Sequence, residues 1–157
     1  AISPFNAFLI LQGIETVTLR MDRICENTLK VAQFLKGHAK VSWVNYAGLP
    51  DHRDHALVQK YMGGRASGIL NFGVKGGAGD AKAAGARFQD ALQLVVRLVN
   101  IGDCKSLACH PASTTHRQLA PEEMAKAGVS EDMVRLSIGI EHIDDILADL
   151  DQALQAA

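Results

Sequence analysis

The chain has 157 residues, 48% of them hydrophobic and 21% charged, a composition typical of one globular domain rather than a disordered or fibrous chain. Its 16 Lys and Arg against 17 Asp and Glu leave a net charge of -1 without a basic cluster, so no nucleic-acid partner is expected. The longest strongly apolar run, residues 8–11, is far shorter than the ~20 residues of a membrane span, so no membrane segment is expected.

The first 36 residues of the chain predict a long helix. Ser3 followed by Pro4 is a helix start, and apolar residues then recur at spacings of three and four to about Lys36. Gly13 lowers helical stability by roughly 1 kcal/mol relative to Ala, so one bent helix, or two in line, is expected. Gly37 is expected to end it.

The rest of the chain alternates between strand and helix patterns. Four strands are predicted at residues 41–46, 69–74, 106–109 and 134–140. Helices are predicted at residues 54–62, 121–127 and 143–156, and another is expected to start at a capping Asp80 and to bury Phe88, Leu92, Val95, Val96 and Val99. Residues 110–119 are expected to form a loop. The pattern predicts a two-layer α/β or α+β sandwich with about four strands.

Several groups of residues have the side chains of a metal, nucleophile or phosphate site, but not the spacing that such sites require. Cys104, Cys109, His110 and His116 are potential metal ligands, but no C-x2-C pair occurs, so no metal is expected. A Cys–His nucleophile has no recognisable base or oxyanion hole beside it. The glycine-rich residues 73–79 lack a phosphate-binding fingerprint and favour a strand-to-helix turn. The three cysteines show no disulfide framework, and with no signal peptide they indicate a reducing cytoplasm.

Two cationic residues, Lys60 and Arg135, each have two possible interpretations. Lys60 could form a Schiff base with a cofactor aldehyde, but its pattern favours a surface lysine on a helix. Arg135 interrupts an otherwise apolar predicted strand. It is either an exposed strand charge or a bidentate clamp for a carboxylate, whose geometry a guanidinium matches, and the residues alone leave both open.

Two long motifs stand out in the second half of the chain. They are Asn100-Ile-Gly-Asp-Cys-Lys-Ser-Leu-Ala-Cys-His-Pro-Ala-Ser-Thr-Thr-His116 and Val134-Arg-Leu-Ser-Ile-Gly-Ile-Glu-His-Ile-Asp-Asp-Ile-Leu-Ala-Asp149. Both resemble the Cys/Met-metabolism family of pyridoxal-phosphate (PLP) enzymes. The resemblance extends over the whole chain. It implies the small C-terminal domain of the aspartate-aminotransferase-like fold, a mostly antiparallel sheet with a long linking helix at residues 1–36 and a substrate-carboxylate-binding domain at residues 37–157.

The resemblance also implies roles for individual residues. Arg135 matches the arginine that binds the substrate α-carboxylate. Asn100 is expected at a helix end and matches a position that assists in binding this carboxylate, and Thr115 matches a position lining the same pocket. The family's Schiff-base lysine lies in a Ser-x-Thr-Lys context, which Lys60, after Leu57-Val58-Gln59, does not match. The chain is therefore expected to contain no catalytic or cofactor-binding residue of its own.

The activity follows from the same resemblance. The segments Asn100-Ile-Gly-Asp and Ser3-Pro-Phe-Asn-Ala-Phe are similar to the sulfhydrylase branch, which replaces the acetate of O-acetyl-L-homoserine with sulfide or a thiol to give homocysteine or methionine. A missing N-terminal PLP domain and a homotetramer are implied, and the chain alone is expected to be inactive. The alternatives are a methionine or cystathionine γ-lyase or γ-synthase of this family, and a non-catalytic free-standing module.

Overall fold

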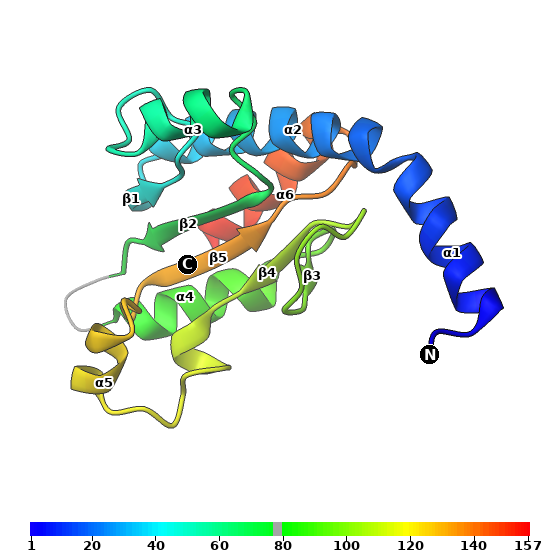
Figure 1. The fold of residues 1–157 in the computed structure, drawn as a ribbon. Helices are drawn as coiled ribbons and strands as arrows, with labels where there is room; N and C mark the ends of the chain where they lie inside the picture. Colours follow the sequence, from blue (N-terminus) through cyan, green and yellow to red (C-terminus); the bar gives the residue numbers. More distant parts are fainter. Residues whose placement is uncertain (77–79) are drawn as a thin grey trace.

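The fold is a sheet with helices packed on it, and the computed structural model describes it for residues 1–76 and 80–157 (Figure 1). The helices are α1 Pro4–Glu15, α2 Val17–Gly37, α3 His55–Met62, α4 Ala81–Ala91, α5 Pro121–Lys126 and α6 Ile143–Gln155, with a 3-10 turn η1 at Pro111–Ser113. The strands are β1 Val41–Asn45, β2 Ile69–Val74, β3 Val96–Arg97, β4 Leu107–Cys109 and β5 Met133–Ser137.

The described residues form one five-stranded sheet in the order β1-β2-β5-β4-β3. All neighbouring strands pair antiparallel except β3 and β4, which are parallel. The expectation of a mostly antiparallel sheet is therefore confirmed, with one strand more than the four predicted. The strand β5 lies at the centre, between β2 and β4, and carries Arg135.

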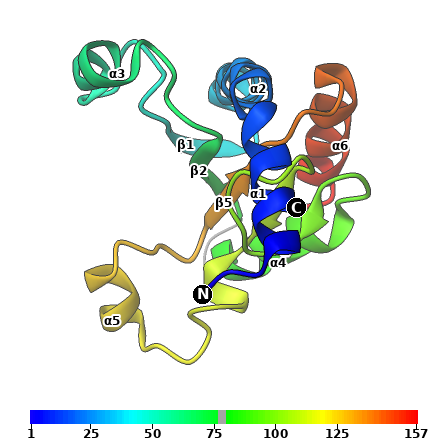
Figure 2. The ribbon, with the colours of Figure 1, turned by 45° about the vertical axis from the view of Figure 1, so that its right-hand side comes forward.

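One face of the sheet is covered by α2, α4 and α6 (Figures 1 and 2). Side chains alternate between the two faces of a strand, and Leu70 and Phe72 of β2 and Val134 and Leu136 of β5 are buried in the core beneath these helices. The rings of Phe72 and Phe88 of α4 meet edge to face, with centroids 5.5 Å apart. The intervening residues of β2 and β5 consequently face the opposite side of the sheet.

The N-terminal helical segment is two helices in line, and the break between them lies at Thr16 instead of at Gly13. Thr16 leaves helical geometry with φ -107 and ψ 3, whereas Gly13 lies inside α1. Glycine favours a bend but does not require one, and the guanidinium of Arg20 bonds the free carbonyl of Gly13 across the break. As predicted, α2 ends at Gly37.

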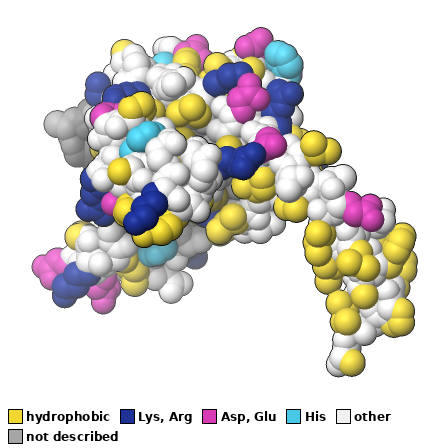
Figure 3. All heavy atoms as spheres, turned by 45° about the horizontal axis from the view of Figure 1, so that its top comes forward, with side chains coloured by type: hydrophobic (Ala, Val, Ile, Leu, Met, Phe, Trp, Pro, Cys, Tyr) yellow, Lys and Arg dark blue, Asp and Glu magenta, His cyan; other side chains and the backbone are white. Residues whose placement is uncertain are grey.

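Helix α1 has no buried residue, although most of its side chains are apolar. Figure 3 shows it as a projecting arm covered with hydrophobic side chains. The exposed apolar residues of this arm, with the start of α2, are Phe5, Phe8, Leu9, Ile10, Leu11, Ile14, Val17 and Leu19.

The predicted helix from Asp80 to Val99 was too long. It ends at Ala91, and Val96 and Arg97 instead form β3, whose side chains are exposed. The competing interaction is tertiary: the buried carboxylate of Asp149 accepts the backbone N–H groups of residues 93, 94 and 95 at 2.9, 2.9 and 2.8 Å. These donors cannot then serve a continuing helix. Asp80 occupies the N-cap position, as predicted, but its carboxylate makes no capping bond and accepts from Arg87 at 2.7 Å instead.

The remaining elements agree with the predicted ones to within a few residues, and β2 has the predicted bounds. The predicted loop at residues 110–119 contains the short turn η1. The predicted glycine turn falls partly at residues 77–79, outside the described residues. Among the described helices none has both the length and the apolarity that crossing a membrane requires.

Candidate functional site

A cavity of about 380 Å³ lies against the sheet face opposite the core. Arg135 of β5 stands in its wall, directly opposite Asn71 of β2 on one side and Cys109 of β4 on the other. Thr115 and His116, from the loop after η1, line the cavity as well. Three adjacent strands and one loop therefore bring these side chains together.

The Arg135 guanidinium is held by a single weak contact. It is half-buried, and its Nη2 donates to the backbone carbonyl of Asn100 at 3.4 Å. Over residues 1–76 and 80–157, Arg135 makes no ion pair with an Asp or Glu. A guanidinium in a cavity with most of its five donors unused can bind a carboxylate through two parallel hydrogen bonds.

Of the two other predicted site residues, Asn100 contacts the guanidinium and Thr115 lines the same cavity. Asn100 offers its carbonyl to Arg135, while its Oδ1 accepts the backbone N–H of Ile101 at 2.9 Å. The expected position of Asn100 at a helix end is wrong, since it lies in an exposed segment after β3. Thr115 is exposed, and its Oγ1 lies 2.8 Å from Nδ1 of His116. The binding roles of Arg135, Asn100 and Thr115 stay predictions.

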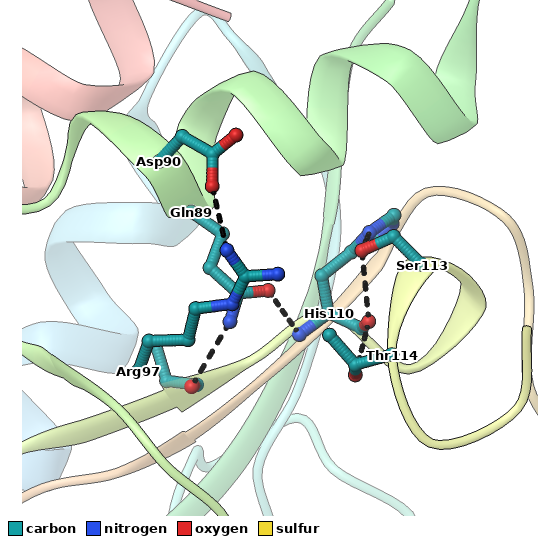
Figure 4. A network of polar contacts seen from close by, with 7 residues as sticks. Gln89, Asp90, Arg97, His110, Ser113 and Thr114 are labelled. Atoms are coloured by element: carbon teal, nitrogen blue, oxygen red, sulfur yellow. Dashed lines mark hydrogen bonds and ion pairs between the residues drawn. The ribbon is translucent and has the colours of Figure 1, made fainter.

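The loop that carries Thr115 is fixed by the buried His110 (Figure 4). The backbone N–H of His110 donates to Oε1 of Gln89 on α4 at 2.8 Å, and the hydroxyl of Thr114 donates to the His110 carbonyl at 2.8 Å. The imidazole lies 2.8 Å from both Oγ of Ser113 and the carbonyl of Glu131. These contacts tie the start of the loop to α4 and to the segment before β5.

Burial is the main cause that lowers the pKa of His110, and the positive charges of Lys82 and Arg97 act in the same direction. The ring is therefore neutral at neutral pH. Because a carbonyl can only accept, Nε2 carries the proton and donates to Glu131, and Nδ1 accepts from the hydroxyl of Ser113. His110 is a structural residue in this arrangement, not a free base.

Sequence reasoning missed Asn71, Cys109 and His116 as residues of the cavity. The strand pattern contained a usable signal for Asn71, because it is the polar residue between Leu70 and Phe72 and so faces away from the core. Pairing register decides which residues flank Arg135, and a single sequence does not state that register.

None of the lysines among the described residues lines the cavity that holds Arg135. Lys60 is exposed on α3, with Nζ 4.8 Å from the centre of the Tyr61 ring, as a surface lysine would be. Cys104 is exposed and Cys109 buried, and within the described part of the chain no three His, Cys, Asp or Glu side chains gather as metal ligands.

Comparisons with known proteins identify the family. Residues 1–155 match the profile of the Cys/Met metabolism PLP-dependent enzymes. The chain is 51% identical over 154 residues to O-acetyl-L-homoserine sulfhydrylase 1 of Thermus thermophilus, covering 98% of the chain and 36% of that protein. It is 54% identical over 156 residues to the O-acetyl-L-homoserine sulfhydrylase of Leptospira meyeri, covering 99% and 34%. It is also 47% identical over 156 residues to an L-methionine gamma-lyase of Pseudomonas putida, covering 99% and 38%.

A solved structure agrees with these relatives. A crystal structure of a Campylobacter jejuni protein assigned as an O-acetylhomoserine (thiol)-lyase, which carries a pyridoxyl-lysine phosphate, superposes with a TM-score of 0.88 at 44% identity. The match covers 99% of the chain and 36% of that protein, so the chain spans roughly a third of the length of the relatives it matches. The chain belongs to the Cys/Met metabolism family of PLP-dependent enzymes.

Proposed function

We propose that this chain supplies the substrate-carboxylate part of an O-acetylhomoserine sulfhydrylase. The complete protein replaces the acetate of O-acetyl-L-homoserine with sulfide or a thiol and releases homocysteine or methionine. The observation that carries the proposal is the Arg135 guanidinium, which faces a cavity without an acidic partner among the described residues. The sulfhydrylase names of the relatives from Thermus and Leptospira support this branch of the family.

The residues of this chain bind and orient the substrate. Arg135 grips the α-carboxylate, the Asn100 carbonyl steadies the guanidinium at 3.4 Å, and Thr115 closes the side of the cavity. PLP, bound by a part of the protein outside this chain, supplies the electron sink for the bond changes at the substrate carbons. A fixed carboxylate restricts how the substrate can turn, which favours one productive orientation.

The test is the Arg135→Ala substitution in the complete protein. Since a charge-assisted bidentate contact contributes ~1.5–3 kcal/mol, kcat/KM for O-acetyl-L-homoserine should fall about 10- to 100-fold, mostly through KM. PLP absorbance should be unchanged. The matched control is Arg87→Ala, which removes an exposed arginine of α4 paired with Asp80 and should leave KM unchanged. Loss of the PLP spectrum with Arg135→Ala, or an unchanged KM, would contradict the proposed role.

A γ-lyase is the second candidate, because the relative from Pseudomonas putida has almost the same coverage and 47% identity. Both activities need the same carboxylate clamp, so the cavity does not separate them. Product analysis does: incubation with O-acetyl-L-homoserine and sulfide should give homocysteine, and incubation with methionine alone should give no thiol and no 2-oxo acid. The reverse result would favour the lyase. A non-catalytic module would give neither product.

The complete protein is further proposed to be a homotetramer in a reducing cytoplasm. The three cysteines Cys25, Cys104 and Cys109 have free thiols, which supports the compartment. Analytical ultracentrifugation of the complete protein tests the assembly.

A further inference from the structure

A row of side chains crosses the open face of the sheet. Asn45 of β1 is paired with Asn71 of β2, Asn71 with Arg135 of β5, and Arg135 with Cys109 of β4. Directly opposite residues of antiparallel strands point to the same face, with Cβ atoms ~4.5–5.5 Å apart. Asn71 is therefore the nearest polar neighbour of Arg135 within the sheet, and both line the cavity.

Hydrogen-bonding groups on these two side chains are left over. Oδ1 of Asn71 is buried and has no partner among the described residues, and such an acceptor costs ~1–3 kcal/mol while it stays unpaired. Arg135 has donors in excess, since the one hydrogen bond of its side chain within the described chain is the one to the Asn100 carbonyl. An unused acceptor and unused donors thus stand next to each other across two strands.

We propose that Asn71 is a positioning residue for the substrate carboxylate, acting through Arg135. When the carboxylate enters, one N–H of the guanidinium turns to Oδ1 of Asn71, and the two donors of the opposite edge face the ligand. An amide is suited to this task because it accepts a hydrogen bond without neutralising the guanidinium. An Asp at the same position would form an internal ion pair and compete with the substrate. The inference rests on the proposed function.

The experiment introduces a competing carboxylate at position 71. Asn71→Asp in the complete protein should raise KM for O-acetyl-L-homoserine about 10- to 100-fold, since the introduced carboxylate occupies the guanidinium. The preference for the free acid over its methyl ester should fall by a similar factor, because the ester depends little on the clamp. Asn71→Ala removes only the acceptor, so kcat/KM for the acid should fall about 3- to 10-fold.

The control is Asn45→Asp, the same change one strand further from Arg135 and outside the cavity. Its carboxylate lies ~5 Å farther along the row and near solvent, where screening weakens it, so KM should stay close to wild type. This variant separates competition at the guanidinium from a general effect of added negative charge.

Arg135→Ala, measured alongside, distinguishes the role of Asn71 from the role of Arg135 as the carboxylate clamp. If Arg135→Ala raises KM and Asn71→Asp leaves both KM and the acid-to-ester preference at wild-type values, the role of Asn71 is overturned and the clamp stands. An unchanged KM in Arg135→Ala overturns the clamp and the role of Asn71 with it. Should Asn71→Asp fail to fold, Asn71→Ala decides, because wild-type kinetics in that variant also overturn the inference.

Discussion

His110 shows how one buried side chain determines the position of the loop that carries Thr115. All its polar groups are used: the ring bonds Ser113 and Glu131, the backbone N–H bonds Gln89, and the carbonyl accepts from Thr114. The packing leaves no spare room, since a Cβ added at Gly85 of α4 would lie 2.3 Å from Nε2 of the ring. The loop with Thr115 thus depends on a neutral imidazole that does not touch the cavity itself.

This arrangement predicts a dependence of stability on pH. Burial lowers the pKa of His110 in the folded protein below its ordinary 6.5, so the unfolded chain binds the proton more readily. The contribution of neutral His110 to the free energy of unfolding is fully present above about pH 6.5 and is lost as pH falls toward the lower folded-state value. Denaturation midpoints between about pH 8 and 5 should therefore drop less steeply in His110→Gln, whose amide can still donate to Glu131.

The control for this prediction is Gln118→Ala, which alters an exposed side chain that does not titrate. It should keep the wild-type slope of stability against pH. A His110→Gln variant with the same slope as wild type would show that the ring is not what titrates in this range.

Among the secondary-structure elements, α6 fixes the segment between α4 and β3. Asp149 is buried and accepts three successive backbone N–H groups of residues 93–95, and Oδ1 also accepts from Gln152 at 2.9 Å. The chain therefore leaves α4 at a fixed angle, pairs β3 with β4, and reaches Asn100 beside Arg135. A side chain of the last helix thus sets the geometry of one wall of the site.

Asp149→Asn should loosen this segment. The substituted amide keeps one acceptor and turns the other into a donor, so bonds to the N–H groups of residues 93–95 are lost at a cost of ~1–3 kcal/mol. Hydrogen exchange of those three amides should become about 10- to 100-fold faster in the complete protein. Asp151→Asn on the same helix removes a carboxylate that contacts only His38 at 3.1 Å in the described structure, and it should leave these amides protected. Unchanged exchange in Asp149→Asn would contradict the account.

The elements differ in how far the sequence predicts them, for physical reasons. β2 and α6 follow from local patterns, because alternation or helical spacing continues over their whole length. β3 does not, since its two residues pair only because Asp149 has ended the helix before them. At the site, Arg135 stood out as a charge in an apolar strand, but its carboxylate role came from the family resemblance and the neighbouring Asn71 from strand register.

At the scale of the whole molecule, the chain has two unlike parts. The sheet and the helices α2, α4 and α6 share one buried core, whereas α1 buries no residue and presents apolar side chains to solvent. The chain also spans only about a third of the length of its relatives. Both observations fit the proposal that this chain works as one portion of a longer PLP enzyme, with the carboxylate clamp here and the cofactor lysine elsewhere.

That division predicts where the cofactor is attached. In the complete protein, borohydride reduction followed by peptide mass spectrometry should find one stoichiometric phosphopyridoxyl-lysine, outside residues 1–157. Residues 1–157 expressed alone and reduced with PLP should carry only trace, distributed adducts, because none of the described lysines lines the cavity. Lys60→Arg keeps the positive charge of this exposed residue and should leave the PLP absorbance of the complete protein intact. A stoichiometric adduct on Lys60, or the loss of absorbance in that variant, would place the cofactor within this chain and reverse the proposed division of labour.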